Sequence, residues 1–203
     1  MRTVGGGTMC VLAQSCLARS SAMRKTKDPL TGLPDRQTFE IILHQSLKTW
    51  FCQGIPACLL VLDLDYFRVV NEQLGYAAGD EMLCQVAVLV AKNVREADPV
   101  SRYGGGSFAV LLPEADLSRG VGLAERLRDE IERHVFLLDA GQVRITASMG
   151  VASLGLTAIE SVGKWMAAAN AALDRAKLKG RNRVVSYGPV PSVPACVALA
   201  AAA

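Results

Sequence analysis

The sequence lacks an apolar segment of the roughly 20 residues that a membrane-spanning helix needs. Its stretch Met9-Cys10-Val11-Leu12-Ala13 begins like a secretory signal, but Gln14 and Ser15 interrupt the apolar run and no clear cleavage site follows. We therefore interpret residues 1–27 as a poorly ordered or helical leader. From these features we expect a cytoplasmic protein without a membrane span.

Cysteine spacings typical of a metal site are also missing. The chain has 6 cysteines, but none of them forms a CxxC pair, and no paired Cys/His spacing suggests zinc. Cys58 and Cys84 lie inside apolar runs, where a cysteine behaves as a small hydrophobic residue. We interpret all of the cysteines as reduced thiols of a cytosolic protein.

Neither sign of charge dominates the chain. With 22 Lys and Arg against 19 Asp and Glu, the net charge is +3, which is too small to favour nucleic acid or a membrane surface as a partner. No internal repeat is visible, and 203 residues suit one globular domain with two ragged ends. We expect this domain at residues 28–187, followed by a Pro/Ala-rich tail at 188–203.

Within residues 28–187, helical periodicity alternates with short apolar runs. Helical spacing predicts helices at about 36–51, from about 79, at 117–134 and at 162–179. Apolar runs predict strands at 57–62, 99–103, 108–112, 143–151 and 183–187. The glycines of residues 104–107 indicate a tight hairpin turn. The predicted fold class is α+β, with a central mixed sheet of about five strands flanked by helices.

Five short motifs follow one another through this domain. They are Asp28-x-Leu30-Thr31-Gly32-Leu33-Pro34, Asp63-Leu64-Asp65-x-Phe67-Arg68-x-x-Asn71-Glu72, Arg102-Tyr103-Gly104-Gly105, Ser148-Met149-Gly150-Val151-Ala152 and Ala176-Lys177-x-x-Gly180-Arg181-Asn182. In this order, the series resembles the GGDEF (diguanylate cyclase) family of bacterial second-messenger signalling. The resemblance implies a nucleotide-cyclase-like fold. It also implies an enzyme that joins two GTP molecules across a homodimer into cyclic di-GMP.

The resemblance places the catalytic centre at the glycine turn, which here reads Gly104-Gly105-Gly106-Ser107-Phe108. Such chemistry needs a divalent cation to neutralise the phosphates. By resemblance, Asp63 and the Leu64 carbonyl are metal ligands, while Gly106 and Ser107 stand where the family has acids. Glycine offers no ligand, and a neutral hydroxyl does not balance metal charge. We therefore expect a weakened Mg²⁺ site and no intact catalytic residues. From the residues alone, Asp63 could instead cap a helix.

Nucleotide-binding residues are better preserved than the catalytic turn. By resemblance, Asn71 and Asp80 read the guanine, for which an amide and a carboxylate have suitable donors and acceptors. Lys177 and Arg181 match the cations that bind the triphosphate, and Arg68 replaces a lysine with the same charge. Taken singly, each of these residues is an ordinary surface residue. Together with Asp63, they favour a retained GTP pocket.

A second ligand motif is Arg95-Glu96-Ala97-Asp98, five residues before the glycine turn. In the family, an RxxD motif at this spacing forms an inhibitory site for cyclic di-GMP. An arginine can bind a phosphate bidentately and stack on guanine, and Arg126 falls where a second arginine often contributes. Without the register, an RxxD is a weak pattern that is commonly a surface ion pair.

Four functions remain open at this level. The first is a cyclic di-GMP receptor that acts as a homodimer or through a protein partner. The second is a residual diguanylate cyclase that uses Asp63, Asp65 or Glu72 in place of the missing acids. The others are a GTP-sensing module and a dimerisation domain without a ligand. The intact guanine-reading pair weakens the last, and the RxxD spacing favours the first over GTP sensing.

Overall fold

The structure, a computed structural model, describes residues 26–155 and 159–188. The expectations for the leader and the tail concern residues that lie almost wholly outside these ranges. Within them, no helix combines the length and the apolar character that crossing a membrane requires.

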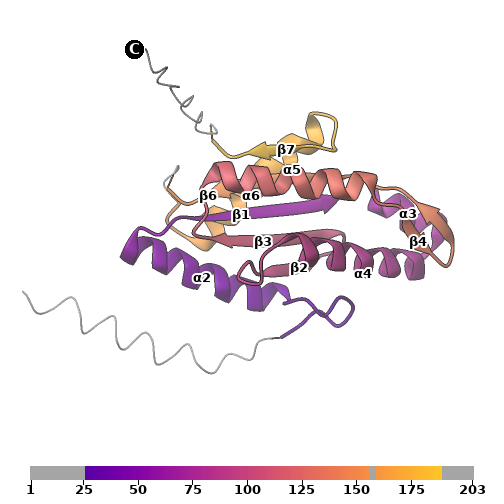
Figure 1. Cartoon of the computed structure of the whole chain (residues 1–203), viewed down its shortest axis with the longest axis horizontal. Helices are drawn as coiled ribbons and strands as arrows, with labels where there is room; N and C mark the ends of the chain where they lie inside the picture. The colour runs from indigo at the N-terminus through magenta and orange to yellow at the C-terminus, as the bar shows by residue number, and fades with distance from the viewer. Residues whose placement is uncertain (1–25, 156–158, 189–203) are drawn as a thin grey trace, which may run out of the picture.

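A mixed five-stranded sheet forms the centre of the domain, as the sequence predicted (Figure 1). Its strand order is β2-β3-β1-β6-β7. The strands are β1 (Ala57–Leu64), β2 (Val100–Gly104), β3 (Ser107–Pro113), β6 (Ala147–Ser153) and β7 (Val184–Ser186). All neighbours pair antiparallel except β6 and β7, which pair parallel.

Helices cover both faces of this sheet, and the alternation along β1 explains why its residues are almost all apolar. Leu60 and Leu62 pack into one core cluster with residues of α4 (Tyr76–Asn93) and α5 (Leu117–Arg133). Leu59 and Val61 pack into a second cluster with α2 (Arg36–Gln53) and α6 (Val162–Leu178). Successive strand residues point to opposite faces, so a strand covered on both faces needs a continuous apolar run.

Side chains cap the three helices that the sequence located best. Asp35, Asp116 and Ser161 accept a hydrogen bond from the backbone N–H three residues onward, at the start of α2, α5 and α6 respectively. These caps satisfy N–H groups that have no partner inside the helix. Inside the second cluster, the buried Trp165 indole donates to the Ala152 carbonyl at 2.9 Å, which ties α6 to β6.

Two predicted boundaries were wrong, because the periodicity of the sequence did not reveal the short elements beside them. The helix expected from about residue 79 is α4, which begins at Tyr76, and the short helix before it, α3 (Phe67–Leu74), was not predicted. None of the eight residues of α3 is fully buried, and its apolar stripe of Phe67, Val70 and Leu74 is short and only partly buried against the core. The strand expected at 143–151 is also divided, because Val143 ends a separate hairpin and β6 begins only at Ala147.

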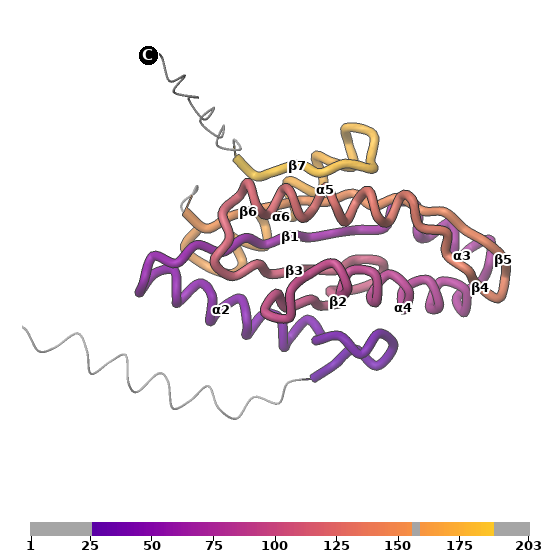
Figure 2. Tube along the Cα trace, viewed as in Figure 1, coloured from indigo at the N-terminus to yellow at the C-terminus, as the bar shows by residue number. Residues whose placement is uncertain are grey.

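That separate hairpin consists of β4 (Phe136–Leu138) and β5 (Gly141–Val143), which pair only with each other. It lies beside α3 at one end of the domain (Figure 2). Strands of three residues are at the lower limit of strand length, which is why their short alternation did not separate them from β6.

Candidate functional site

The glycine turn lies at the tip of the β2–β3 hairpin, beside the end of β1. Gly104 and Gly105 have φ values of 150° and 51°, in the region that glycine adopts without a steric penalty. The Leu64 N–H donates to the Gly106 carbonyl at 3.2 Å. In the sheet register, Asp63 pairs with Ser107. The turn therefore keeps a backbone geometry that places its third and fourth residues next to Asp63.

The Asp28 motif braces this hairpin from the N-terminal side. The Arg102 guanidinium pairs with the Asp28 carboxylate at 3.2 Å and also donates to the Gly105 carbonyl at 3.3 Å. The pKa of Asp28 lies below its ordinary value. Burial acts to raise this pKa, but the hydrogen bonds from the Thr31 hydroxyl and backbone, together with the Arg102 charge, outweigh burial. Asp28 is therefore a structural anchor for the turn.

Both carboxylate oxygens of Asp63 have partners within the chain. The Ser107 hydroxyl donates to Oδ1, and the Lys177 ammonium lies 2.7 Å from Oδ2. The pair is partly shielded, with 23% of the Asp63 side chain and 33% of the Lys177 side chain exposed. Asp63 does not cap a helix, because the N-cap of α3 is Tyr66, which makes no side-chain cap bond. The capping interpretation of Asp63 is therefore wrong.

The space next to Gly106 is filled by an aromatic ring. A Cβ atom added to Gly106 would lie 3.0–3.3 Å from the ring and Cβ of Phe67, which is tighter than ordinary van der Waals contact. An acidic side chain at this position thus requires the Phe67 ring to move by a few tenths of an ångström. This steric constraint was invisible in the sequence, because Phe67 and Gly106 are far apart along the chain.

These residues do not fit a magnesium ion. Mg²⁺ demands near-octahedral oxygen coordination, and in proteins it is held by one or two carboxylates with waters and phosphates. Here Asp63 is the one carboxylate of the predicted ligand set, and its oxygens are bound by Ser107 and Lys177. Across residues 26–155 and 159–188, no group of three or more His, Cys, Asp or Glu side chains could hold a metal.

Three other predicted nucleotide-binding residues lie on the two helices that follow β1 in the chain. Asn71 of α3 lies against the first turn of α4, where a Cβ on Gly79 would be 1.8 Å from its Oδ1, and the exposed Asp80 follows Gly79. Arg68 forms an exposed ion pair with Glu72 at 2.7 Å. Asp63 and Lys177 meet directly, whereas the guanine-reading pair belongs to the adjoining helices α3 and α4.

Arg181 makes a contact that no sequence signal indicated. Its guanidinium lies over the Tyr66 ring, 4.6 Å from the centroid, in a cation–π arrangement. Tyr66 is 64% exposed and adopts a left-handed φ of 58°, as Arg181 does with a φ of 63°. Strained backbone of this kind clusters at binding sites, so Tyr66 is an additional candidate nucleotide-site residue.

Asp65 holds the framework of this site. It is only 3% exposed, and it accepts hydrogen bonds from the Thr146 and Ser148 hydroxyls at 2.7 Å and from the Asn182 backbone at 3.0 Å. A carboxylate with three donors is committed to structure. Asp65 thus ties the end of β1 to β6 and to the loop that carries Arg181.

The RxxD motif lies at the opposite end of β2 from the glycine turn. Asp98 is 8% exposed, and its Oδ2 accepts from the Arg95 backbone N–H at 3.1 Å. The Arg126 guanidinium donates to the Asn93 carbonyl at 2.6 Å. A cavity of about 310 Å³ joins these elements; its lining residues are Asn93, Val94, Arg95, Asp98, Leu112, Arg119, Gly122, Leu123 and Arg126. The three residues predicted for cyclic di-GMP therefore share one cavity.

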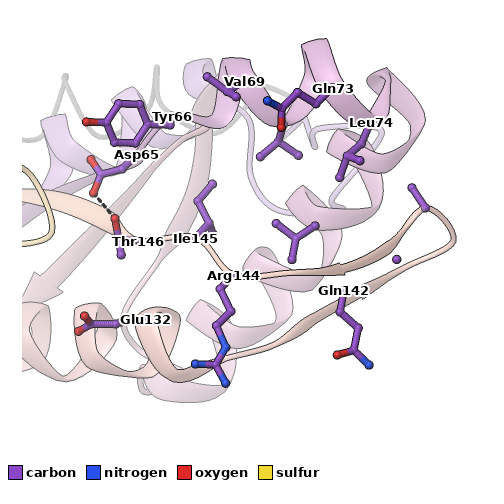
Figure 3. A pocket seen from close by; sticks show the side chains of 14 residues that line it. Asp65, Tyr66, Val69, Gln73, Leu74, Glu132, Gln142, Arg144, Ile145 and Thr146 are labelled. Carbon is purple, nitrogen blue, oxygen red and sulfur yellow. Dashed lines mark hydrogen bonds between the residues drawn. The ribbon is translucent and has the colours of Figure 1, made fainter.

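A further cavity of about 720 Å³ lies between α3 and the chain that runs from the β4–β5 hairpin to β6 (Figure 3). Val69, Gln73 and Leu74 line it from α3, and Arg144 and Ile145 line it from the other side. Asp65 and Tyr66 also line it, whereas none of the nucleotide-binding residues predicted from the sequence does. This cavity therefore adjoins the candidate nucleotide site through Tyr66.

Residues 25–183 match the family described as "Diguanylate cyclase, GGDEF domain". The chain belongs to this family. The match extends through all five motifs, so the predicted family and fold are confirmed.

Two curated relatives are diguanylate cyclases. Diguanylate cyclase DgcP of Pseudomonas aeruginosa is 39% identical over 158 residues, which cover 77% of this chain and 23% of DgcP. Diguanylate cyclase A of Treponema denticola is 34% identical over 162 residues, covering 78% of this chain and 43% of that protein. The chain thus spans less than half the length of these relatives.

Solved GGDEF domains share the fold. The GGDEF domain of DgcB from Caulobacter crescentus, solved in complex with c-di-GMP, has a TM-score of 0.77 and 30% identity, and the similarity covers 82% of this chain and 96% of that one. Diguanylate cyclase SiaD of Pseudomonas aeruginosa, solved with its activator SiaC, has a TM-score of 0.75 and 30% identity, with 87% of this chain and 66% of SiaD covered.

Proposed function

We propose that this GGDEF domain is a cyclic di-GMP receptor that does not synthesise the compound. The observation that carries the proposal is the cavity shared by Arg95, Asp98 and Arg126. It combines arginines, which bind phosphate and stack on guanine, with a carboxylate that accepts from the guanine edge. The similarity to a DgcB domain solved with c-di-GMP supports this ligand.

We propose a different part for each residue of this site. Arg95 is exposed, and its guanidinium is the group we assign to the ligand phosphate. Asp98 uses Oδ2 to hold the Arg95 backbone, so we assign the guanine edge to Oδ1. Arg126 donates one of its N–H groups to the Asn93 carbonyl, which leaves its other donors for a ligand. Arg119 lines the same cavity and adds a third cation.

The size of the cavity favours a site completed by a second surface. A volume of about 310 Å³ is at the lower end of small-molecule pockets. It accommodates a guanine and a phosphate rather than an intercalated ligand dimer. Two stacked guanines would need arginines from two surfaces, so binding is proposed to promote a homodimer or contact with a partner protein in the cytoplasm.

A working cyclase is the less favoured alternative. The acids proposed to replace the turn carboxylates are Asp63, Asp65 and Glu72, of which Asp63 is itself the expected metal ligand and is bound by Ser107 and Lys177. Asp65 already accepts three hydrogen bonds, and Glu72 is paired with Arg68 on an exposed helix face. Neither is placed beside the glycine turn by any of these contacts. A GTP-binding role for the residues near Asp63 is compatible with the receptor function, because the glycine turn beside Asp63 and the RxxD motif lie at opposite ends of β2.

Replacement of Arg95 by alanine tests the receptor site. Loss of a charge-assisted phosphate contact is expected to weaken cyclic di-GMP binding by about 1.5–3 kcal/mol, or roughly tenfold to a hundredfold. Isothermal titration calorimetry measures the change. Arg133→Ala is the control, because Arg133 is an exposed arginine of α5 that pairs with Asp129 within that helix and does not line the cavity.

The outcomes of this titration test the site assignment and the receptor function separately. Unchanged affinity in Arg95→Ala contradicts the site assignment, and absence of binding to the wild-type protein at micromolar ligand contradicts the receptor function. Asp98→Ala is expected to weaken cyclic di-GMP binding and to leave GTP binding unchanged. Asp98→Asn keeps an acceptor for the Arg95 backbone N–H but removes the negative charge. Comparison of the two variants therefore separates the effect of losing this hydrogen bond from the effect of losing the charge.

A further inference from the structure

We propose that Lys177 takes the place of the divalent cation at Asp63, so that the nucleotide site binds GTP in its metal-free form. The inference rests on the GTP-binding part of the proposed function and is independent of cyclic di-GMP binding at Arg95. It follows from the partners of Asp63, from the residue that fills the space beside Gly106, and from the charges around the turn.

The position of the ammonium group is the first support. Asp63 is an odd-numbered residue of β1 and continues the face of Leu59 and Val61, which is the face that α6 covers. Lys177 is near the C-terminal end of α6, and its Nζ lies 2.7 Å from Asp63 Oδ2. The packing of α6 on β1 thus places a positive charge beside Asp63, the carboxylate that the family resemblance assigns to the metal.

Closure of the remaining coordination positions is the second support. The Ser107 hydroxyl binds Asp63 Oδ1, and the Phe67 ring packs where a side chain at Gly106 would begin. A Mg²⁺ ion would have to displace the Lys177 ammonium, and the two cations repel each other at this distance. It would gain one carboxylate, the lower end of the number that holds Mg²⁺ in proteins.

Charge balance is the third support. With acids at positions 106 and 107, the turn would repel phosphate unless a cation screened it. Here both positions are neutral, and Lys177 offsets the charge of Asp63. Arg181, over the Tyr66 ring, adds a cation at the same end of the sheet. Phosphates can therefore approach the turn without a metal, whereas Mg²⁺ bound to GTP would bring a cation against Lys177.

Titration of the wild-type protein with GTP, in EDTA and in excess Mg²⁺, tests the inference directly. Affinity in EDTA is expected to equal or exceed the affinity in Mg²⁺. Titration with Mn²⁺ alone, followed by electron paramagnetic resonance, is expected to show no bound ion at this site. A gain in GTP affinity of roughly tenfold or more on addition of Mg²⁺ overturns the proposal. So does an absence of GTP binding in both buffers.

Substitution of Lys177 identifies the group responsible. Lys177→Met is expected to weaken metal-free GTP binding by roughly tenfold to a hundredfold, the value of a charge-assisted contact, while Lys177→Arg retains it. Lys179→Met is the matched control, because Lys179 is exposed at the end of the same helix. Equal affinity of the Lys177→Met and wild-type proteins in EDTA overturns the assignment. Cyclic di-GMP titrations of the same samples report separately on the receptor function.

Discussion

Gly150→Ala is expected to lower the free energy of unfolding by about 3 kcal/mol or more, the upper part of the range for overpacked cores. Gly150 lies in β6 beneath α6, where an added Cβ would be 2.1 Å from the Ala169 carbonyl oxygen and 2.4 Å from the Leu173 nitrogen. Both are backbone atoms, so no side-chain rotation relieves the overlap. The helix itself must move away from the sheet.

Urea unfolding followed by circular dichroism measures this loss. Gly163→Ala, on the helix α6 that packs over Gly150, is the control, because the nearest atom to its added Cβ is the Ser161 hydroxyl at 4.0 Å. At such an exposed helical position, alanine is expected to stabilise the protein by about 0.4–1 kcal/mol through the unfolded state. A loss below about 1 kcal/mol in Gly150→Ala would show that α6 is less tightly seated than the distances indicate.

The same displacement has a consequence for the nucleotide site. Lys177 is on α6, and Asp63 is on the neighbouring strand β1. A helix that lifts from the sheet to make room for a methyl group takes the ammonium away from the carboxylate. Any Gly150→Ala protein that still folds is therefore expected to bind GTP more weakly.

Elements with long, regular patterns were predictable from the sequence. The continuous apolar run of β1 indicated burial on both faces, and helices pack on both of its faces. The helices α5 and α6 were located to within one residue, because each has a regular apolar stripe and a capping residue. By contrast, α3 has 8 residues and the strands β4 and β5 have 3 each, which is too short for a periodic pattern to identify them.

The chemistry of the candidate site was only partly predictable. The motifs identified Asp63, Lys177 and Arg181 as candidates, and the sequence itself shows that positions 106 and 107 have no acid. The partners of these groups depend on tertiary contacts between residues far apart in the chain. No local pattern could show that Lys177 binds Asp63, that Phe67 packs against Gly106, or that Asp65 is committed to Thr146 and Ser148.

Incubated with GTP and Mg²⁺, the purified protein is expected to form no measurable cyclic di-GMP. Loss of a metal ligand and of an acidic partner removes several kcal/mol of transition-state stabilisation, and each 1.4 kcal/mol is about a tenfold change in rate. The Lys177 ammonium and the Ser107 hydroxyl add to this loss, because they occupy the remaining carboxylate. Chromatographic assay of the nucleotide products is the measurement.

The double variant Gly106→Asp, Ser107→Glu provides the counterpart. It introduces both acids and removes the hydroxyl that binds Asp63. The added negative charges favour binding of a divalent metal ion over the single charge of the Lys177 ammonium. The Phe67 ring must give way by a few tenths of an ångström to admit the aspartate. We expect the variant to gain Mn²⁺ binding and some turnover. Robust Mg²⁺-dependent synthesis by the wild-type protein, abolished by Asp63→Ala, would contradict the proposal that this domain only binds nucleotide.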